Sequence, residues 1–138
     1  MTVDAIDTNV LLRFLVETPA SMPAKFRGVF SFFGKLEAAE ISVHLPDLVV
    51  FQTIFVLTSH YEVPAPVAAE KLVRLISFRG IQMTQKHLML DCLDRMQSGA
   101  DDLVDAWLAA WCHDQKRVGV YSFDVGLKKQ GLELLAVE

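Results

Sequence analysis

The stretch A-I-D-T-N-V-L-L-R-F-L, residues 5–15, joins a predicted strand to a predicted helix at one aspartate, Asp7. Residues 3–6 form the predicted strand, and residues 8–16 carry apolar side chains at helical spacing. A carboxylate at such a junction costs free energy unless a cation or hydrogen-bond donors compensate its charge. Asp7 therefore marks the first turn of the fold and is the first candidate functional residue.

The rest of the chain repeats this alternation of strand and helix. Further strands are predicted at 41–45, 81–83, 118–121 and 132–137. Helices are predicted from Pro23 to Leu36 and at 46–61, 67–78, 86–96, 103–116 and 125–129. Such alternation favours an α/β fold, in which a parallel sheet of about five strands lies between two helical layers in a three-layer α/β/α sandwich.

Length and composition limit the kind of protein. With 138 residues, 52% of them hydrophobic, the chain fits a single domain over 1–138. The longest apolar stretch, 48–57, is too short to cross a bilayer, and no secretion signal precedes the first strand, so we expect a cytoplasmic protein without membrane contact. Cys92 and Cys112 lack metal-ligand spacing and are expected to be reduced core thiols.

Two more aspartates stand at the beginnings of helices. Asp105 lies in D-D-L-V-D-A-W-L-A-A and Asp124 in G-V-Y-S-F-D-V-G-L-K-K, while Asp102 precedes Asp105 by three residues and faces the same way. Ligands of open α/β sheets bind beyond the carboxyl ends of the strands, so Asp7, Asp105 and Asp124 are expected to converge there on a metal ion. The alternative is that these acids are helix caps and first-turn acids favoured by the helix dipole.

These three segments, in this order and spacing, resemble the PIN domain, and most closely the small bacterial toxins of VapC type. The resemblance covers essentially the whole chain. It implies a flavodoxin-like sheet ordered 3-2-1-4-5 and an endoribonuclease that uses Mg²⁺ or Mn²⁺. It further implies an antitoxin partner and commonly a homodimer. By position, Asp7, Asp105 and Asp124 match the family's catalytic, metal-binding acids, and Asp102 matches an auxiliary metal-binding acid.

The residues around the acids agree with the family except at one position. Thr8, Asn9 and Ser122 match polar residues that support the cluster, but Gln52 stands where the family has a glutamate. Glutamine keeps a carbonyl acceptor and removes a negative charge, so metal binding is expected to weaken. Asp47 lies on a different helix face and is not expected to substitute. Two alternatives follow: an impaired PIN-like domain that binds RNA or antitoxin, or a buried amide satisfied by backbone groups.

The expected chemistry is phosphodiester hydrolysis by a metal-activated water, which requires no Ser, His or Cys nucleophile. The four histidines share no ligand spacing, and a net charge of -4 with a pI near 5.5 requires a polyanion to bind at local basic positions or through metal. Arg13 and Lys128 are candidates for contacting substrate phosphate. A phosphoaspartate enzyme of the haloacid dehalogenase type ranks last, because that motif needs an aspartate where Asn9 stands.

Aromatic residues raise the question of exposed surface. Trp107 and Trp111 are four residues apart on one predicted helix, where core or dimer packing is favoured over a platform for base stacking. Phe32 lies off the apolar face of its own helix and hints at a partner surface. Together with a mean hydropathy of +0.33, this predicts a homodimer that is poorly soluble without its antitoxin.

Overall fold

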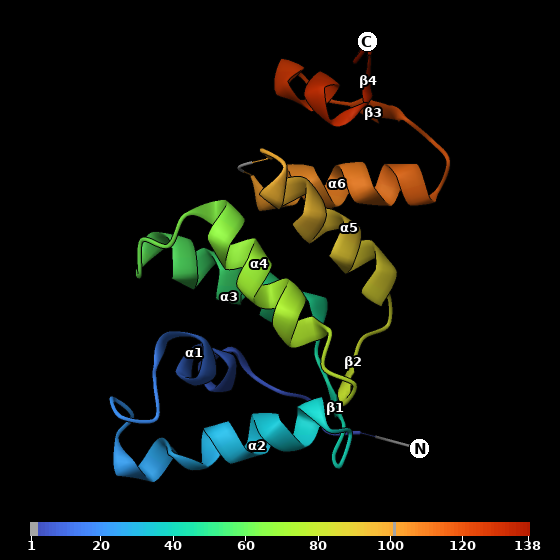
Figure 1. The fold of residues 1–138 in the computed structure, drawn as a ribbon. Coiled ribbons are helices and arrows are strands. Elements are labelled where there is room, and N and C mark those ends of the chain that lie inside the picture. The colour runs from blue at the N-terminus through green and yellow to red at the C-terminus, as the bar shows by residue number, and fades with distance from the viewer. Residues whose placement is uncertain (1–2, 101) are drawn as a thin grey trace.

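Helices dominate the structure, a computed structural model that describes residues 3–100 and 102–138 (Figure 1). The α-helices are α1 (Thr8–Val16), α2 (Gly28–Glu37), α3 (Asp47–Ser59), α4 (Ala65–Ile76), α5 (Lys86–Gln97) and α6 (Leu103–Asp114). Short 3-10 helices are η1 (Ala24–Phe26) and η2 (Val125–Gln130). The strands are β1 (Val43–His44), β2 (Ile81–Gln82), β3 (Gly119–Tyr121) and β4 (Glu133–Leu135).

Local sequence signals explain where the helices begin. Asp7 and Asp102 cap α1 and α6 with their side-chain oxygens, as acids do at helix N-termini. Pro46 immediately precedes α3, and Pro66 lies in the first turn of α4, where a missing N–H does no harm. The predicted helices therefore occur close to their expected positions, and the predicted span 8–16 coincides with α1.

The main core contains buried residues from all six α-helices, and α1 to α5 supply most of its leucines. Each of these five helices contributes leucines that are fully buried, namely Leu11, Leu36, Leu57, Leu72 and Leu93 on α1 to α5 in order. Burying one such side chain stabilises a fold by about 1.5–3 kcal/mol. A second, smaller cluster contains Ala109 and Cys112 of α6 with Leu127 and Leu132, and it attaches the C-terminal segment to α6. The expectation of a single domain over 1–138 stays a prediction.

The predicted five-stranded sheet is wrong. The described residues contain two separate parallel sheets of two strands each, β1 with β2 and β3 with β4. Residues 3–6 form no strand of their own and make one parallel bridge, between Ala5 and His44. Figure 1 shows β1 and β2 beside the N-terminal segment, whereas β3 and β4 lie at the opposite end, beyond α6. The order 3-2-1-4-5 and the three-layer sandwich are therefore absent from this part of the chain.

The five-stranded sheet does not form because the strands are short. Each is two or three residues long, so the sheets are held by few ladder hydrogen bonds and the helices supply most of the buried apolar surface. The C-terminal pair packs on α6 through its own cluster, apart from the main core. Nothing in a three-residue strand specifies which further strand must lie at its edge.

The turn before β2 depends on a glycine. The Gly80 N–H donates to the Leu36 carbonyl at 2.8 Å, and the Gly80 carbonyl accepts from the Val43 N–H at 2.8 Å. A Cβ atom on Gly80 would lie 2.8 Å from the Leu36 carbonyl oxygen, closer than side-chain carbons pack.

We expect Gly80→Ala to lower the free energy of unfolding by about 1–3 kcal/mol, the usual cost of overpacking. Gly34→Ala is the matched control, because a Cβ there meets no atom within 4 Å and lies inside α2. Helix propensity predicts that the control is neutral or stabilising by up to about 1 kcal/mol. Urea unfolding followed by circular dichroism measures both variants, and equal stability of Gly80→Ala and wild type would contradict the close packing at this turn.

Candidate metal centre

Asp7 belongs to a group of polar side chains that connects α1 to α3. One Asp7 carboxylate oxygen accepts from the Thr8 N–H at 2.7 Å, and the Thr8 hydroxyl donates to the Gln52 Oε1 at 2.8 Å. Thr8 is buried, whereas Asp7, Asn9 and Gln52 are exposed. The structure therefore brings together three of the predicted residues, which we call the Asp7 group: Asp7, Thr8 and Gln52.

Gln52 does not behave as a buried amide. Its side chain is exposed, and the hydrogen bond that it accepts comes from a threonine hydroxyl instead of the backbone. The interpretation of this residue as a core amide satisfied by backbone groups is therefore wrong. Asp47 lies at the start of the same helix, where burial raises the pKa of its carboxyl and nearby His44 partly opposes that effect.

A second group lies where α6 and η2 begin. One Asp102 carboxylate oxygen accepts from the Asp105 N–H at 3.0 Å. One Asp124 carboxylate oxygen accepts from the Gly126 N–H at 2.8 Å, and the Ser122 hydroxyl accepts from the Asp124 N–H at 3.0 Å. We call Asp102, Asp105, Ser122 and Asp124 the Asp105 group. Asp102 and Asp124, like Asp7, therefore cap helices, as the structural alternative for these acids predicted.

The ionisation of Asp105 is influenced by its acidic neighbours. The pKa of Asp105 is raised, first by partial burial and then by the negative charges of Asp102 and Asp124, and a hydrogen bond with the Asp124 side chain adds to this. None of the ion pairs in the described ranges includes these acids. Two carboxyls, one from α6 and one from the start of η2, thus lie near enough for the charge of Asp124 to act on Asp105.

A cavity of about 190 Å³ lies beside this group, lined by Asp102 and Asp105 together with Gly126 and Lys129. Lys129 was not among the predicted site residues, although it adjoins the candidate Lys128 in the K-K pair. Its position in η2 identifies it, because this 3-10 helix places Lys129 and not Lys128 at the cavity. Lys128 is exposed in the same turn.

The two groups do not meet within one chain. Among residues 3–100 and 102–138, no set of three or more His, Cys, Asp or Glu side chains is placed to hold a metal ion. Figure 1 shows why: α1 and η2 lie toward opposite ends of the molecule, with α5 and α6 between them. The roles given to Asp7, Asp105 and Asp124 stay predictions. Their donor atoms are all oxygens, which suit a hard divalent cation.

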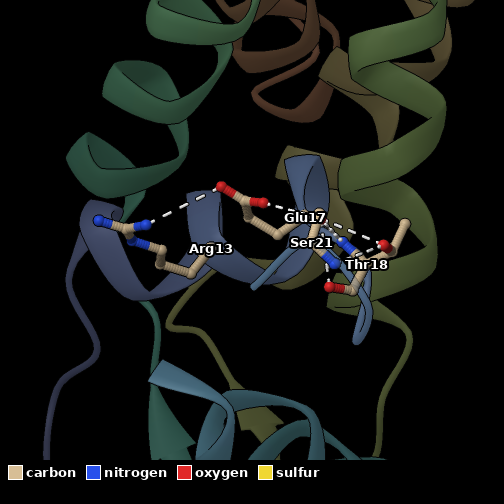
Figure 2. Close-up of polar contacts among 4 residues, drawn as sticks. All are labelled: Arg13, Glu17, Thr18 and Ser21. Carbon is tan, nitrogen blue, oxygen red and sulfur yellow. Dashed lines mark hydrogen bonds and ion pairs between the residues drawn. The ribbon is translucent and has the colours of Figure 1, made fainter. Parts of the chain in front are cut away.

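Arg13 contacts protein groups near the C-terminal end of α1. Figure 2 shows its guanidinium directed toward Glu17, with an N–O distance of 3.9 Å, and Glu17 in turn accepts from the Ser21 hydroxyl at 2.9 Å. The guanidinium also lies 3.9 Å from the centre of the Phe26 ring. These contacts give Arg13 a packing role between α1 and η1, and phosphate binding by this residue stays a prediction.

Several other predictions concern packing. Trp107 packs edge-on against Phe51 with ring centres 5.3 Å apart, in agreement with the favoured packing role, while Trp111 is exposed. Cys92 and Cys112 are free and buried, as expected, and burial raises the pKa of the Cys92 thiol to about 12.

No helix in the described ranges is both long and apolar enough to cross a bilayer.

Comparison with protein-family models, with curated proteins and with solved structures found no match to this chain. The evidence for the function of this chain therefore lies in its acids, their hydrogen bonds and the open surfaces near them.

The raised pKa of Asp105 predicts a pH dependence of stability. Because folding raises this pKa, the folded state binds more protons, and stability falls as pH rises from the ordinary Asp value toward the folded value. Asp105→Asn removes the free-energy cost of ionising this carboxyl in the folded state. We therefore expect a small rise in melting temperature at pH 7 that disappears below about pH 4. Thermal melts of both proteins from pH 3 to 8 measure this, and a gain that persists at low pH would assign the effect to something other than ionisation.

Proposed function

We propose that this chain is a divalent-metal-dependent endoribonuclease of the toxin type suggested by its resemblance to PIN domains. The observation that supports this best is the grouping of Asp105 with Asp102 and Asp124, whose charges help to raise the Asp105 pKa and which appear in no described ion pair. Like charges held together in this way are stabilised when a cation joins them. An all-oxygen donor set fits Mg²⁺ or Mn²⁺ better than softer metals.

Each residue has a proposed role. Asp105 and Asp124 hold the metal, with Asp102 as an auxiliary ligand that also caps α6. Asp7 is the further ligand that the resemblance implies, although its group does not meet the Asp105 group within one chain. Thr8 orients Gln52 through the hydroxyl hydrogen bond, and Ser122 holds the backbone of Asp124 in place. Lys129 is better placed than Lys128 to contact a phosphate beside Asp105, because it lines the same cavity.

A bound Mg²⁺ or Mn²⁺ supplies a water of lowered pKa and positive charge beside the scissile phosphate. The protein's own contribution is to hold carboxylates at fixed positions, which the capping hydrogen bonds of Asp7, Asp102 and Asp124 accomplish. Fixed hydrogen-bond acceptors cost little reorganisation when substrate arrives. No nucleophilic Ser, His or Cys enters the proposal, and both cysteines are buried.

The proposed partners are an RNA substrate, an antitoxin protein and a second copy of the chain, in the cytoplasm. Exposed apolar side chains support a protein partner: Leu48, Phe55 and Val104 are 77%, 67% and 68% exposed. Phe55 and Val104 also line a mainly apolar cavity of about 640 Å³ between α3 and α6. Apolar surface of this kind favours a binding partner.

An impaired PIN-like domain that binds RNA or antitoxin is the second candidate. The feature that favours it is Gln52, which brings no negative charge to the Asp7 group and whose carbonyl oxygen is already used by Thr8.

RNA cleavage separates the two candidates. We expect wild type to cleave single-stranded RNA with Mn²⁺ or Mg²⁺ and to lose this with EDTA, while Asp124→Asn lowers the rate by at least about a hundredfold because a ligand charge is lost. Asp114→Asn is the control, since Asp114 pairs with His87 at the other end of α6. RNA binding without metal-dependent cleavage would favour the impaired domain.

Restoring the missing charge tests the Asp7 group. Gln52→Glu should tighten Mn²⁺ binding about tenfold or more, since one added charge near a cation contributes about 1 to 4 kcal/mol. The same change should destabilise the metal-free fold through repulsion. Gln115→Glu adds an equal charge at an exposed position at the C-terminal end of α6, away from both acidic groups, and is the control. Calorimetric titration that finds unchanged affinity in Gln52→Glu would remove Gln52 from the site.

A further inference from the structure

A polar cleft of about 450 Å³ lies between α5, α6 and η2, and we call it the basic cleft. Each of these helices contributes one basic side chain to its wall, namely Arg95, His113 and Lys129 in that order. Ser98 and the exposed Asp94 also line it. The whole chain carries a net charge of -4, so this gathering of basic side chains is a local exception to its overall charge.

Two of the basic side chains are held in position by the same backbone oxygen. The Arg95 guanidinium donates to the Gln130 carbonyl through Nη1 at 3.2 Å, and the Nε2 atom of His113 lies 3.2 Å from the same oxygen. The Nε of Arg95 also donates to the Asp91 carboxylate at 3.1 Å. These contacts fix the planar guanidinium and leave its Nη2 group without a hydrogen-bond partner in the described ranges.

The side chain of Lys129 takes no such part in the fold. Basic side chains commonly bind the last carbonyls of a helix, and Gln130 ends η2, so the contacts of Arg95 and His113 have a structural explanation. That explanation does not extend to Lys129, which is exposed and enters no ion pair among the described residues. Its ammonium group is therefore available to an anion.

The basic cleft adjoins the cavity beside Asp105. Lys129 and Gln130 line both hollows, so the two meet at this pair of residues. The cavity of about 190 Å³ contains the acids Asp102 and Asp105, whereas the cleft contains the basic side chains. A strand with phosphates at regular spacing fits this arrangement, because one phosphate can bind a metal ion at the acids while a neighbouring phosphate binds in the cleft.

We propose that the basic cleft binds the phosphodiester backbone of RNA beside the scissile phosphate. The ligand assigned here rests on the proposed function, since RNA is taken to occupy both hollows. Lys129 carries a compact charge on a flexible stem and contacts phosphate where the hollows meet, and Arg95 offers the remaining donors of a fixed guanidinium. Contacts to phosphate position a strand without reading its sequence, so the cleft sets where the RNA lies.

Lys129→Gln tests the cleft through RNA binding alone. We expect it to weaken the binding of a fluorescein-labelled single-stranded oligoribonucleotide about threefold or more in EDTA. The slope of log K against log salt should become shallower by about 0.7, the value for one phosphate contact on a single strand. Lys129→Arg should keep affinity and slope, as should Arg117→Gln, which removes an equal charge at an exposed position outside both hollows. Fluorescence anisotropy over a salt series measures all four proteins.

Asp94→Asn should act in the opposite direction. It removes the negative charge from the wall of the cleft, so we expect RNA to bind about twofold or more tightly. Glu40→Gln removes an equal charge at an exposed position that lines neither hollow and should leave the affinity unchanged. Weaker or equal binding by Asp94→Asn would count against an anion site, because a side chain that only supports the fold would not strengthen RNA binding when its charge is removed.

The outcomes separate the cleft from the nuclease. A wild type that does not bind RNA, or equal affinity and salt slope in wild type and Lys129→Gln, would overturn the proposal. RNA binding that depends on Lys129, without metal-dependent cleavage, would uphold the cleft and remove the nuclease. Metal-dependent cleavage with unchanged RNA binding in Lys129→Gln would remove the cleft alone.

Inorganic phosphate distinguishes an RNA strand from a small anion. When it is added at the same concentration of phosphate groups and at constant ionic strength, we expect it not to displace the oligoribonucleotide. The reason is that a strand makes several linked contacts, which raises the effective concentration of each phosphate at its site. Displacement under these conditions would assign the cleft to a free anion and would overturn the proposal.

Discussion

Two hydrogen bonds between His44 and the segment 4–6 are the interaction on which the rest of the structure depends. They fix the direction in which the chain enters α1 and put Asp7 at the carboxyl end of the paired segments. From there the first helix packs against α3, which brings the Thr8 hydroxyl within 2.8 Å of Gln52. The same two bonds use only one side of the segment, so the Ala5 edge is left open.

In this protein, the hydrogen bonds that cap helices also hold the candidate metal-binding carboxylates in place. Asp7, Asp102 and Asp124 each accept a backbone N–H at the start of a helix, which holds the carboxylate in place and leaves its second oxygen available. A capping acid is therefore compatible with a metal ligand, and the two interpretations of these residues do not exclude each other. Asp105 is different, because partial burial and the charges of Asp102 and Asp124 raise the pKa of its carboxyl.

The sequence predicted local structure better than long-range pairing. Helical periodicity and the capping acids placed α1 and α6, and the apolar runs before Ser122 and before the C-terminus correspond to β3 and β4. The single sheet failed because strand order depends on which edges meet, and a strand such as Gly119–Tyr121 carries no residue pattern that specifies its neighbour. The pairing of Asp105 with Asp102 followed from their spacing of three residues. The grouping of Asp124 with these two acids and away from Asp7 did not, because it depends on how the C-terminal segment packs on α6.

The central claim is that Asp105 and Asp124 together hold a divalent cation. Calorimetric titration of Mn²⁺ into wild type, Asp105→Asn and Asp114→Asn tests it most directly. We predict that Asp105→Asn weakens Mn²⁺ binding at least about tenfold, because it removes a ligand charge, whereas Asp114→Asn, at the other end of α6, binds as wild type does. Equal affinity in all three proteins would contradict the claim.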